Sequence, residues 1–332
     1  MTKIEAARQE YYDWCEAIGI ESLDRLREVL EEGKGMELIN LCEARQERKY
    51  AGVANQIFWN RKRMPIVMMS GPSSSGKTSS SLRIAQQCRV LGMSPKVIEL
   101  DNYFVDREQT PRDENGEYDF ECLGAMDIEL LNQQINDLLN GKEVIIPKYD
   151  FVSGYKKFDE SRKMKLEEKD VLFMEGIHAL NPDLTPAVDQ SKIFRIYISA
   201  LSALPGGEKV HNSTVDKRLL RRIVRDYRTR GTSPEANILR WPSVRRGEKL
   251  YIFPYEENAR MVFNSSTLYD LPVLKYYAEP LLHEIAETSP AYEKAQQLLK
   301  FLENIKALTP AEIAVIPPTS IMREFIGGQK LW

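Results

Sequence analysis

The pattern of apolar and polar positions changes once along the chain, at Pro65. Residues 2–62 are rich in Glu, Arg, Leu and Ala, contain no proline, and repeat apolar side chains at helical spacing. This pattern predicts two or three amphipathic helices, broken near Gly19 and across residues 33–35. We interpret residues 1–62 as a helical N-terminal extension that serves packing or oligomerisation.

After Pro65, short apolar runs bounded by turn formers alternate with helical patterns. Such runs are typical of buried parallel strands, and their alternation with helices implies right-handed crossovers. The predicted strands cover residues 65–70, 96–100, 143–146, 171–174 and 193–198, and the predicted helices cover residues 77–91, 127–139 and 277–305. The fold class is therefore α/β, a mostly parallel sheet flanked by helices, with residues 63–332 as one domain.

Composition and net charge indicate a globular protein and argue against binding to nucleic acid by bulk charge. Of 332 residues, 42% are hydrophobic and 29% are charged, as in an ordinary globular protein. The formal net charge of −3 excludes a protein that coats nucleic acid by bulk charge. No apolar run approaches the roughly 20 residues that cross a bilayer, and the first residues lack the apolar segment of a signal peptide. We expect no membrane partner.

The four cysteines are widely separated and contain no CxxC pair. Zinc sites need clustered ligands, and a disulfide framework needs more cysteine in a shorter chain. We therefore predict reduced thiols in a cytoplasmic protein.

Residues 71–78 read GPSSSGKT and match the phosphate-loop pattern G-x-x-x-x-G-K-[ST] at every defined position. An apolar run precedes the loop and a helical pattern follows it, so backbone N–H groups and the helix N-terminus can surround an anion. In this pattern the lysine reaches the β- and γ-phosphates and the last hydroxyl binds Mg²⁺. The residues predicted to bind ATP here are Gly71, Pro72, Ser73, Ser74, Ser75, Gly76, Lys77, Thr78 and Ser79.

Two carboxylates follow predicted strands at the edge of the sheet where ligands bind. Asp101 comes directly after residues 96–100, and Glu175 follows residues 171–174 and precedes Gly176, the position of a Walker-B acid. A carboxylate at such a strand end can accept a proton from a hydroxyl group or hold a metal-bound water. We predict catalytic and metal-binding roles for these two acids.

Residues 217–230 contain seven basic residues and one acid, Asp226. Arg218, Arg222 and Arg225 are spaced to share one helical face. We interpret this helix as part of a lid whose arginines stabilise the charge that spreads during phosphoryl transfer. A solvated basic face or an RNA contact stays open as the alternative. The lid is predicted to span about residues 205–250, with hinges at Gly206, Gly207 and Gly231.

Six motifs, in this order, resemble those of the uridine kinase/phosphoribulokinase family of P-loop kinases, over roughly residues 64–280. They are GPSSSGKTS, LDNYF, YDFE, IPKYDF, FMEGIHALN and RLLRRIVRDYRTRG. The segments DNYFVDREQTPRDENGEYDFE, WPSVRRGEKLYIFP and SIMREFIGG are similar to a bacterial uridine-kinase-related subgroup. Longer members of that subgroup carry a portion resembling part of threonyl-tRNA synthetase. That portion is absent here, and residues 1–62 resemble the helical connector that would precede the kinase domain.

The resemblance implies ATP- and Mg²⁺-dependent phosphorylation of a nucleoside hydroxyl group, with lysine and arginine side chains stabilising the transferred charge. It implies that Asp101 is the catalytic base, that Asp119 holds the ribose hydroxyls and that Tyr149 lies at the nucleobase. The remaining residues it implies are Tyr103 on the substrate side, Lys77, Arg222 and Arg225 in catalysis, Arg222, Arg225 and Arg230 in the lid, and Thr78, Glu175 and Asp101 at magnesium.

The substrate side departs from the family pattern. Uridine–cytidine kinases place a histidine where this chain has Gly154, and Thr232 and Arg240 replace a usual arginine and glutamine. Losing a hydrogen-bond partner for the base changes selectivity strongly. The acceptor is therefore a uridine- or cytidine-like nucleoside or, alternatively, a purine nucleoside or another sugar-like molecule. The second hypothesis is a non-catalytic ATP-binding regulatory or RNA-associated module that uses residues 217–230 and 244–249, and a homo-oligomer stays open.

Overall fold

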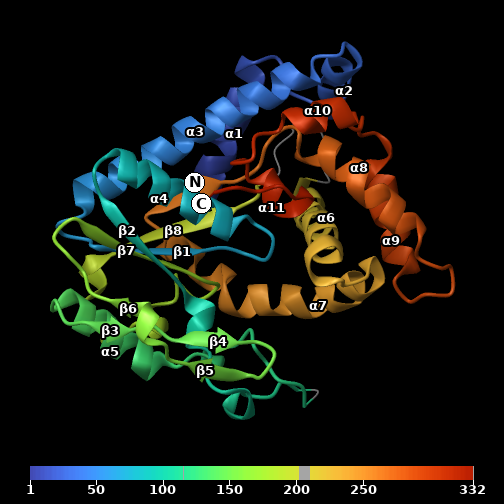
Figure 1. Cartoon of the computed structure of the whole chain (residues 1–332). Coiled ribbons are helices and arrows are strands. Elements are labelled where there is room, and N and C mark those ends of the chain that lie inside the picture. The colour runs from blue at the N-terminus through green and yellow to red at the C-terminus, as the bar shows by residue number, and fades with distance from the viewer. Residues whose placement is uncertain (115, 202–209, 332) are drawn as a thin grey trace.

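The computed structural model describes residues 1–114, 116–201 and 210–331. Its centre is a five-stranded sheet in the order β2-β7-β1-β8-β9 (Figure 1), in which every neighbouring pair is parallel. The strands are β1 (Ile66–Ser70), β2 (Ser94–Glu99), β7 (Asp170–Glu175), β8 (Ile193–Ser199) and β9 (Met261–Asn264). The predicted α/β fold with a mostly parallel sheet flanked by helices is confirmed. Because all five strands run in one direction, their C-terminal ends meet at one edge.

The two faces of the sheet bury alternate residues of the central strand. Ile66 and Met68 of β1 pack in a cluster with helix α5 (Ile128–Leu139). Val67 and Met69 pack in a second cluster with α4 (Lys77–Val90) and α3 (Gly35–Asn60). Successive side chains of a strand point to opposite faces, so a continuous apolar run serves a sheet that is covered on both sides.

The prediction for residues 143–146 was partly wrong. A strand forms there, β3 (Val144–Ile145), but it pairs antiparallel with β6 (Lys163–Met164) outside the main sheet. Pro147, two residues after the end of β3, cannot donate a hydrogen bond to a ladder, which keeps the strand short. A second small hairpin joins β4 (Lys148–Asp150) to β5 (Tyr155–Lys157).

Three helices form before the sheet, as the sequence pattern predicts. They are α1 (Lys3–Ala17), α2 (Leu23–Glu31) and α3, and the chain turns between them at Gly19 and Gly33, both with positive φ. Tyr11 and Leu38 from this region join a buried cluster with Leu219 and Leu274 of the C-terminal helices. Residues 1–62 therefore pack against the rest of the protein, while the domain boundary at residue 62 stays a prediction.

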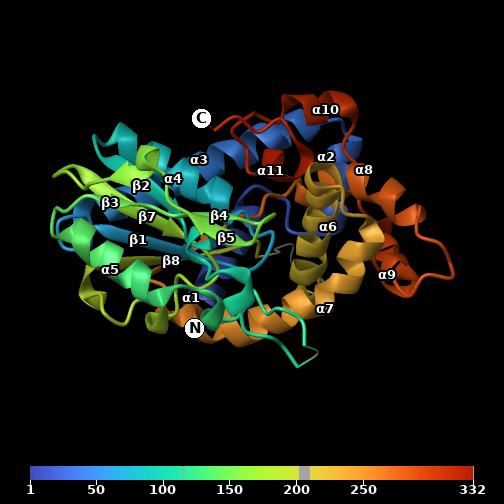
Figure 2. The same ribbon diagram turned by 60° about the horizontal axis from the view of Figure 1, so that its bottom comes forward.

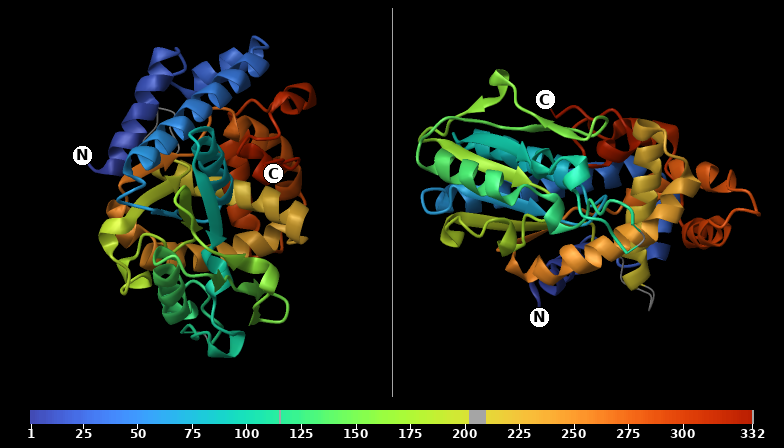
Figure 3. Two further views of the ribbon diagram at one scale, coloured as in Figure 1. Left: turned by 60° about the vertical axis from the view of Figure 1, so that its left-hand side comes forward. Right: turned by 90° about the horizontal axis from the view of Figure 1, so that it is seen from below.

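The C-terminal region is helical and lies to one side of the sheet in Figure 1, in Figure 2 and in the right-hand view of Figure 3. The predicted helix over residues 277–305 is two helices, α8 and α9, separated at residues 284–291. The start of the predicted lid, with Gly206 and Gly207, falls outside the described residues. The helices are α6 (Val210–Arg230), α7 (Pro234–Tyr251), α8 (Asp270–His283), α9 (Tyr292–Glu303), α10 (Pro310–Val315) and α11 (Met322–Ile326).

Within the described ranges, no helix combines the length and apolar character needed to span a bilayer. None of the four cysteines, all of which lie in those ranges, forms a disulfide bond.

Candidate active site

The phosphate loop connects the central strand β1 to the first residue of α4, as the sequence predicts. Gly76 has φ +81°, a conformation that favours glycine, and a Cβ on Gly71 would overlap the carbonyl oxygen of Ile198 in β8. The loop thus folds tightly against the neighbouring strand. The hydroxyls of Ser74 and Ser75 are buried without a hydrogen-bond partner among the described residues, as expected of a cradle for an anion.

Thr78 and Glu175 meet at the end of the loop. The Thr78 hydroxyl donates a 2.7 Å hydrogen bond to Oε1 of Glu175, the last residue of β7. Burial raises the pKa of the Glu175 carboxyl to about 7, and the nearby Lys77 opposes this shift. A hydroxyl and a carboxylate are oxygen ligands suited to Mg²⁺, which also takes phosphate oxygens and waters. The described residues contain no cluster of three or more His, Cys, Asp or Glu side chains that could hold a metal alone.

Asp101 lies in the 3₁₀ turn Leu100–Tyr103 that follows β2. The residue is exposed. Desolvation by the surrounding protein nevertheless raises the pKa of its carboxyl group above the ordinary value. Lys77 and Arg230 act in the opposite direction, and Glu99 adds to the rise. The charges of Asp101, Lys77 and Glu175 therefore influence one another at one end of the phosphate loop.

Asp119, the predicted ribose-binding acid, has a neighbour in Tyr251 that sequence reasoning missed. Tyr251, at the end of α7, directs its hydroxyl toward Oδ2 of Asp119 at 3.4 Å. Glu121 lies two residues after Asp119. Burial raises the pKa of its carboxyl group, and the positive charges of Lys77 and Arg222 oppose this shift. Sequence reasoning also missed Glu121, although the residue belongs to the same YDFE motif as Asp119.

The two tyrosines predicted at the substrate are both buried in the cluster that contains Ile66 and Met68 of β1. Tyr149 lies in an aromatic group, with its ring centroid 5.5 Å from that of Phe104 and 5.1 Å from that of Phe151. Tyr103 is 1% exposed, lies in the same 3₁₀ turn as Asp101 and donates a 2.7 Å hydrogen bond to Gln134.

The Arg107 side chain occupies the space beside Gly154. A Cβ there would come within 2.8 Å of the Cβ of Arg107, and the Arg107 guanidinium donates a 2.6 Å hydrogen bond to the carbonyl oxygen of Phe151. An arginine therefore lies where a side chain at position 154 would be.

The three predicted lid arginines gather around Asp226 on α6. Arg222 Nε lies 3.5 Å from that carboxylate, Arg225 Nε donates to it at 2.7 Å, and Arg230 Nη1 lies 3.6 Å away. Arg222 also donates a 2.9 Å hydrogen bond from Nη1 to the hydroxyl of Ser73 in the phosphate loop. The lid helix therefore touches the loop through the Arg222 side chain, and the buried Arg218 and Arg221 also donate hydrogen bonds to the carbonyl oxygens of Ser73 and Ser74, at 3.0 and 3.4 Å.

The predicted common face of Arg218, Arg222 and Arg225 is divided in the structure. Arg218 is 1% exposed and pairs with Glu248 of α7, with Nη2 and Oε2 at 2.9 Å. Glu248 in turn accepts a 3.0 Å hydrogen bond from the backbone N–H of Ser73. Burial alone would raise the pKa of Glu248, but pairing with Arg218 and Arg245 lowers it. Sequence reasoning missed Glu248, because its partners are distant in the chain.

A model of the phosphoribulokinase / uridine kinase family matches residues 66–271. The chain belongs to this family. The uridine kinase of Macrococcus caseolyticus is 34% identical over 182 residues, 54% of this chain and 78% of that protein. The uridine kinase of Ligilactobacillus salivarius is 31% identical over 185 residues, 55% and 77% of the two chains. The protein is therefore a kinase, a phosphotransferase with a hydroxyl acceptor, and its P-loop is a nucleotide-binding element.

Two solved structures resemble the kinase at low identity. A possible uridine kinase from Bacillus stearothermophilus has a TM-score of 0.42 and 18% identity, over 65% of this chain and 98% of that one. D-glycerate 3-kinase from Cryptococcus neoformans has a TM-score of 0.34 and 13% identity, over 84% and 87%. The family assignment rests on the sequence matches.

Two of the three basic residues of segment 244–249 of the kinase, Arg245 and Arg246, form ion pairs. Arg245 donates to Glu248 at 2.6 Å, while Arg246 contacts Asp113 at 3.0 Å and Glu114 at 2.6 Å. These ion pairs reduce the positive charge that Arg245 and Arg246 could offer to an RNA phosphate backbone.

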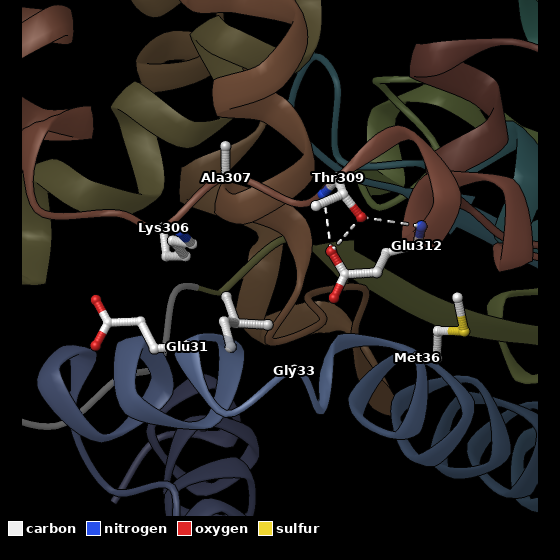
Figure 4. A pocket seen from close by; sticks show the side chains of 8 residues that line it. Glu31, Gly33, Met36, Lys306, Ala307, Thr309 and Glu312 are labelled. Carbon is white, nitrogen blue, oxygen red and sulfur yellow. Dashed lines mark hydrogen bonds between the residues drawn. The ribbon is translucent and has the colours of Figure 1, made fainter.

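A separate cleft of the kinase lies between the α2–α3 turn and the segment before α10 (Figure 4). Thr309 donates its backbone N–H to Glu312 at 2.8 Å on one wall, and Met36 lies on the other. Its lining contains none of the predicted site residues, and we assign it no function.

Proposed function

We propose that this kinase transfers the γ-phosphoryl group of ATP to a hydroxyl group of a uridine- or cytidine-like nucleoside. The observation that carries the proposal is the convergence of Asp101 and the Thr78–Glu175 pair on Lys77 at the end of the phosphate loop. The uridine kinases among its relatives support a nucleoside acceptor.

The phosphate loop would hold the triphosphate through its backbone N–H groups and Lys77. Thr78, Glu175 and Asp101 supply the oxygen atoms that would hold Mg²⁺, and the fit rests on the Thr78–Glu175 contact of 2.7 Å. Bound Mg²⁺ neutralises charge on the phosphate oxygens. Ser74 and Ser75 place two buried hydroxyls within the same loop.

Asp101 would accept the proton of the attacking hydroxyl group. Its raised pKa brings a carboxylate closer to the range of an effective base, and its exposure leaves room for a substrate. Arg222 and Arg225 would stabilise negative charge on the transferred group, and Arg230 would contact ATP. Most of the rate enhancement then comes from positioning and electrostatics.

Asp119 and Tyr149 would bind the nucleoside, with the aromatic group around Tyr149 beside the base. Arg107 fills the space at Gly154 and offers only hydrogen-bond donors. A base with two carbonyl oxygens, as in uracil, suits such a residue.

We further propose residues 63–332 as the kinase domain, residues 1–62 as its extension, and the cytoplasm as its location. The four cysteines without a disulfide bond support that location.

The test is transfer from ATP·Mg²⁺ across a panel of pyrimidine nucleosides, purine nucleosides and sugars, with products identified by mass. Asp101→Asn is the test variant, and Asp24→Asn, which makes the same change at an exposed position of α2, is the matched control. We expect a pyrimidine nucleoside monophosphate from wild type and control and none from Asp101→Asn. A product only from sugars would overturn the nucleoside assignment, and ADP binding with no product from any acceptor would favour a non-catalytic module.

A further inference from the structure

The segment Ser320–Gln329, here called the C-terminal strap, crosses beside the phosphate loop. It lies beyond the residues 66–271 that the family model matches, and it includes the SIMREFIGG motif. Figure 1 and Figure 2 both show its helix α11 between α4 and α6. The strap is therefore an addition to the matched kinase core that reaches the nucleotide-binding loop.

Three strap side chains contact the loop and the first turn of α4. The Ile321 side chain occupies the space where a Cβ on Gly76 would be. The hydroxyl of Ser79 donates a hydrogen bond to Glu324, and Gln329 donates a 2.7 Å hydrogen bond from Nε2 to the same hydroxyl. Ser79 is fully buried beneath these contacts.

The strap is itself anchored to the helices around it. Ser320 donates a 2.8 Å hydrogen bond to Glu43 of α3 and lies 3.0 Å from the hydroxyl of Tyr269. The guanidinium of Arg221 in α6 lies 4.9 Å from the ring centroid of Phe325. These contacts fix the strap against the lid helix as well as against α4.

The sheet order tells which side of the loop the strap covers. The loop follows the central strand β1, while Asp101 follows β2 at one edge of the sheet. Tyr269, which contacts the strap, follows β9 at the opposite edge. The strap and the proposed base therefore flank the loop from opposite sides, so the strap is placed away from the acceptor.

We propose that the C-terminal strap forms a wall of the nucleotide site and sets the affinity of the kinase for ATP. This inference rests on the proposed function. Loop N–H groups cradle the α- and β-phosphates. Glu324 and Gln329 are positioning residues, since they act through Ser79 in the first turn of α4, and Ile321 supports Gly76.

The test compares nucleotide and acceptor binding in strap variants. Calorimetry gives the Kd for ADP·Mg²⁺, and steady-state kinetics give KM for ATP and for the acceptor. Loss of a hydrogen bond to a charged group predicts that Glu324→Ala raises the Kd for ADP about tenfold or more and KM for ATP in parallel, with KM for the acceptor unchanged. Glu324→Gln keeps an acceptor oxygen for Ser79 and should restore most of the affinity.

Gln329→Ala provides a milder variant if Glu324→Ala fails to fold, and we expect a rise of about two- to tenfold in the same constants. Lys330→Ala, an exposed position next to the strap, is the matched control. An unchanged Kd for ADP in folded Glu324→Ala or in folded Gln329→Ala, or an equal rise in both KM values, would overturn the inference. A wild-type protein that binds ADP yet transfers no phosphate would contradict the proposed function alone; one that binds no ADP would overturn both.

Discussion

The two halves of the basic helix α6 use the same residue types in different ways. Lys217, Arg218 and Arg221 are at most 3% exposed, and each has a buried carboxylate partner. Arg221 Nη2 lies 2.5 Å from Asp270, and Lys217 lies 3.5 Å from the same group. Burial lowers the pKa of Lys217 to about 8, which shows how unfavourable an isolated charge would be there.

The second half keeps spare positive charge. Arg222, Arg225 and Arg230 share the single carboxylate of Asp226, and Arg222 reaches Ser73. Three guanidinium groups with one carboxylate leave a net positive charge beside the phosphate loop. The comparison teaches that one half of the helix pairs each buried cation with a buried carboxylate, while the other half keeps the positive charge that, in our proposal, binds phosphate.

The largest expected effect is on the buried half. Arg221→Met leaves Asp270 as a buried, partly compensated charge, and we expect the free energy of unfolding to fall by about 3–5 kcal/mol. Urea denaturation measures it. The double variant Arg221→Met/Asp270→Leu removes both charges and should recover part of the loss. Unchanged stability in the single variant would remove the distinction between the halves.

Arg222→Met should produce the opposite result. It removes a group that contacts the loop, so we expect kcat/KM to fall about 10²–10³-fold. The free energy of unfolding should change by less than about 1 kcal/mol. Kinetics and denaturation of the same preparation measure both quantities. A stability loss equal to that of Arg221→Met would contradict the comparison.

Asp226→Asn sharpens the comparison by removing the carboxylate that orients the second half. The side chain keeps its size and one acceptor oxygen, so we expect kcat/KM to fall about tenfold, less than in Arg222→Met. Steady-state rates with ATP and acceptor varied separately measure the effect. A variant with rates equal to wild type would show that Asp226 does not orient the arginines.

Arg230 is exposed, with 58% of its side chain accessible. Exposed ion pairs contribute at most about 1 kcal/mol and are screened by salt. Arg230→Ala should therefore raise KM for ATP only about two- to fivefold, and less at high salt. KM measured at two ionic strengths tests this, and a large salt-independent rise would indicate a buried role.

The smallest effect is expected at Arg246, outside α6. Its partners Asp113 and Glu114 already neutralise it. Arg246→Ala should keep kcat/KM within about twofold of wild type. A loss of measurable RNA binding in this variant would revive the RNA-associated alternative.

Much of the site was predictable because its determinants are local. The phosphate loop is a contiguous motif between an apolar run and a helical pattern. Asp101 and Glu175 follow predicted strands, so their meeting at one edge follows from a parallel sheet. The helices before Pro65 were equally readable from their apolar spacing and from the breaks at Gly19 and residues 33–35.

The contacts that could not be predicted from the sequence join segments that are far apart in the chain. Glu248 lies 175 residues from Ser73, and Glu324 lies 245 residues from Ser79. No local pattern marks a glutamate as the partner of a particular serine. The position of β3 outside the main sheet, and the placement of Arg107 against Gly154, likewise depend on tertiary packing.

The most direct measurement is single-turnover phosphoryl transfer from ATP·Mg²⁺ to uridine, combined with the Kd for ADP, in wild type and Asp101→Asn. Loss of a general base lowers rates by about 10²–10⁴-fold. We predict a fall of that size in transfer, with nucleotide affinity close to that of wild type. Transfer in Asp101→Asn at more than a tenth of the wild-type rate would contradict the assignment of Asp101 as the base.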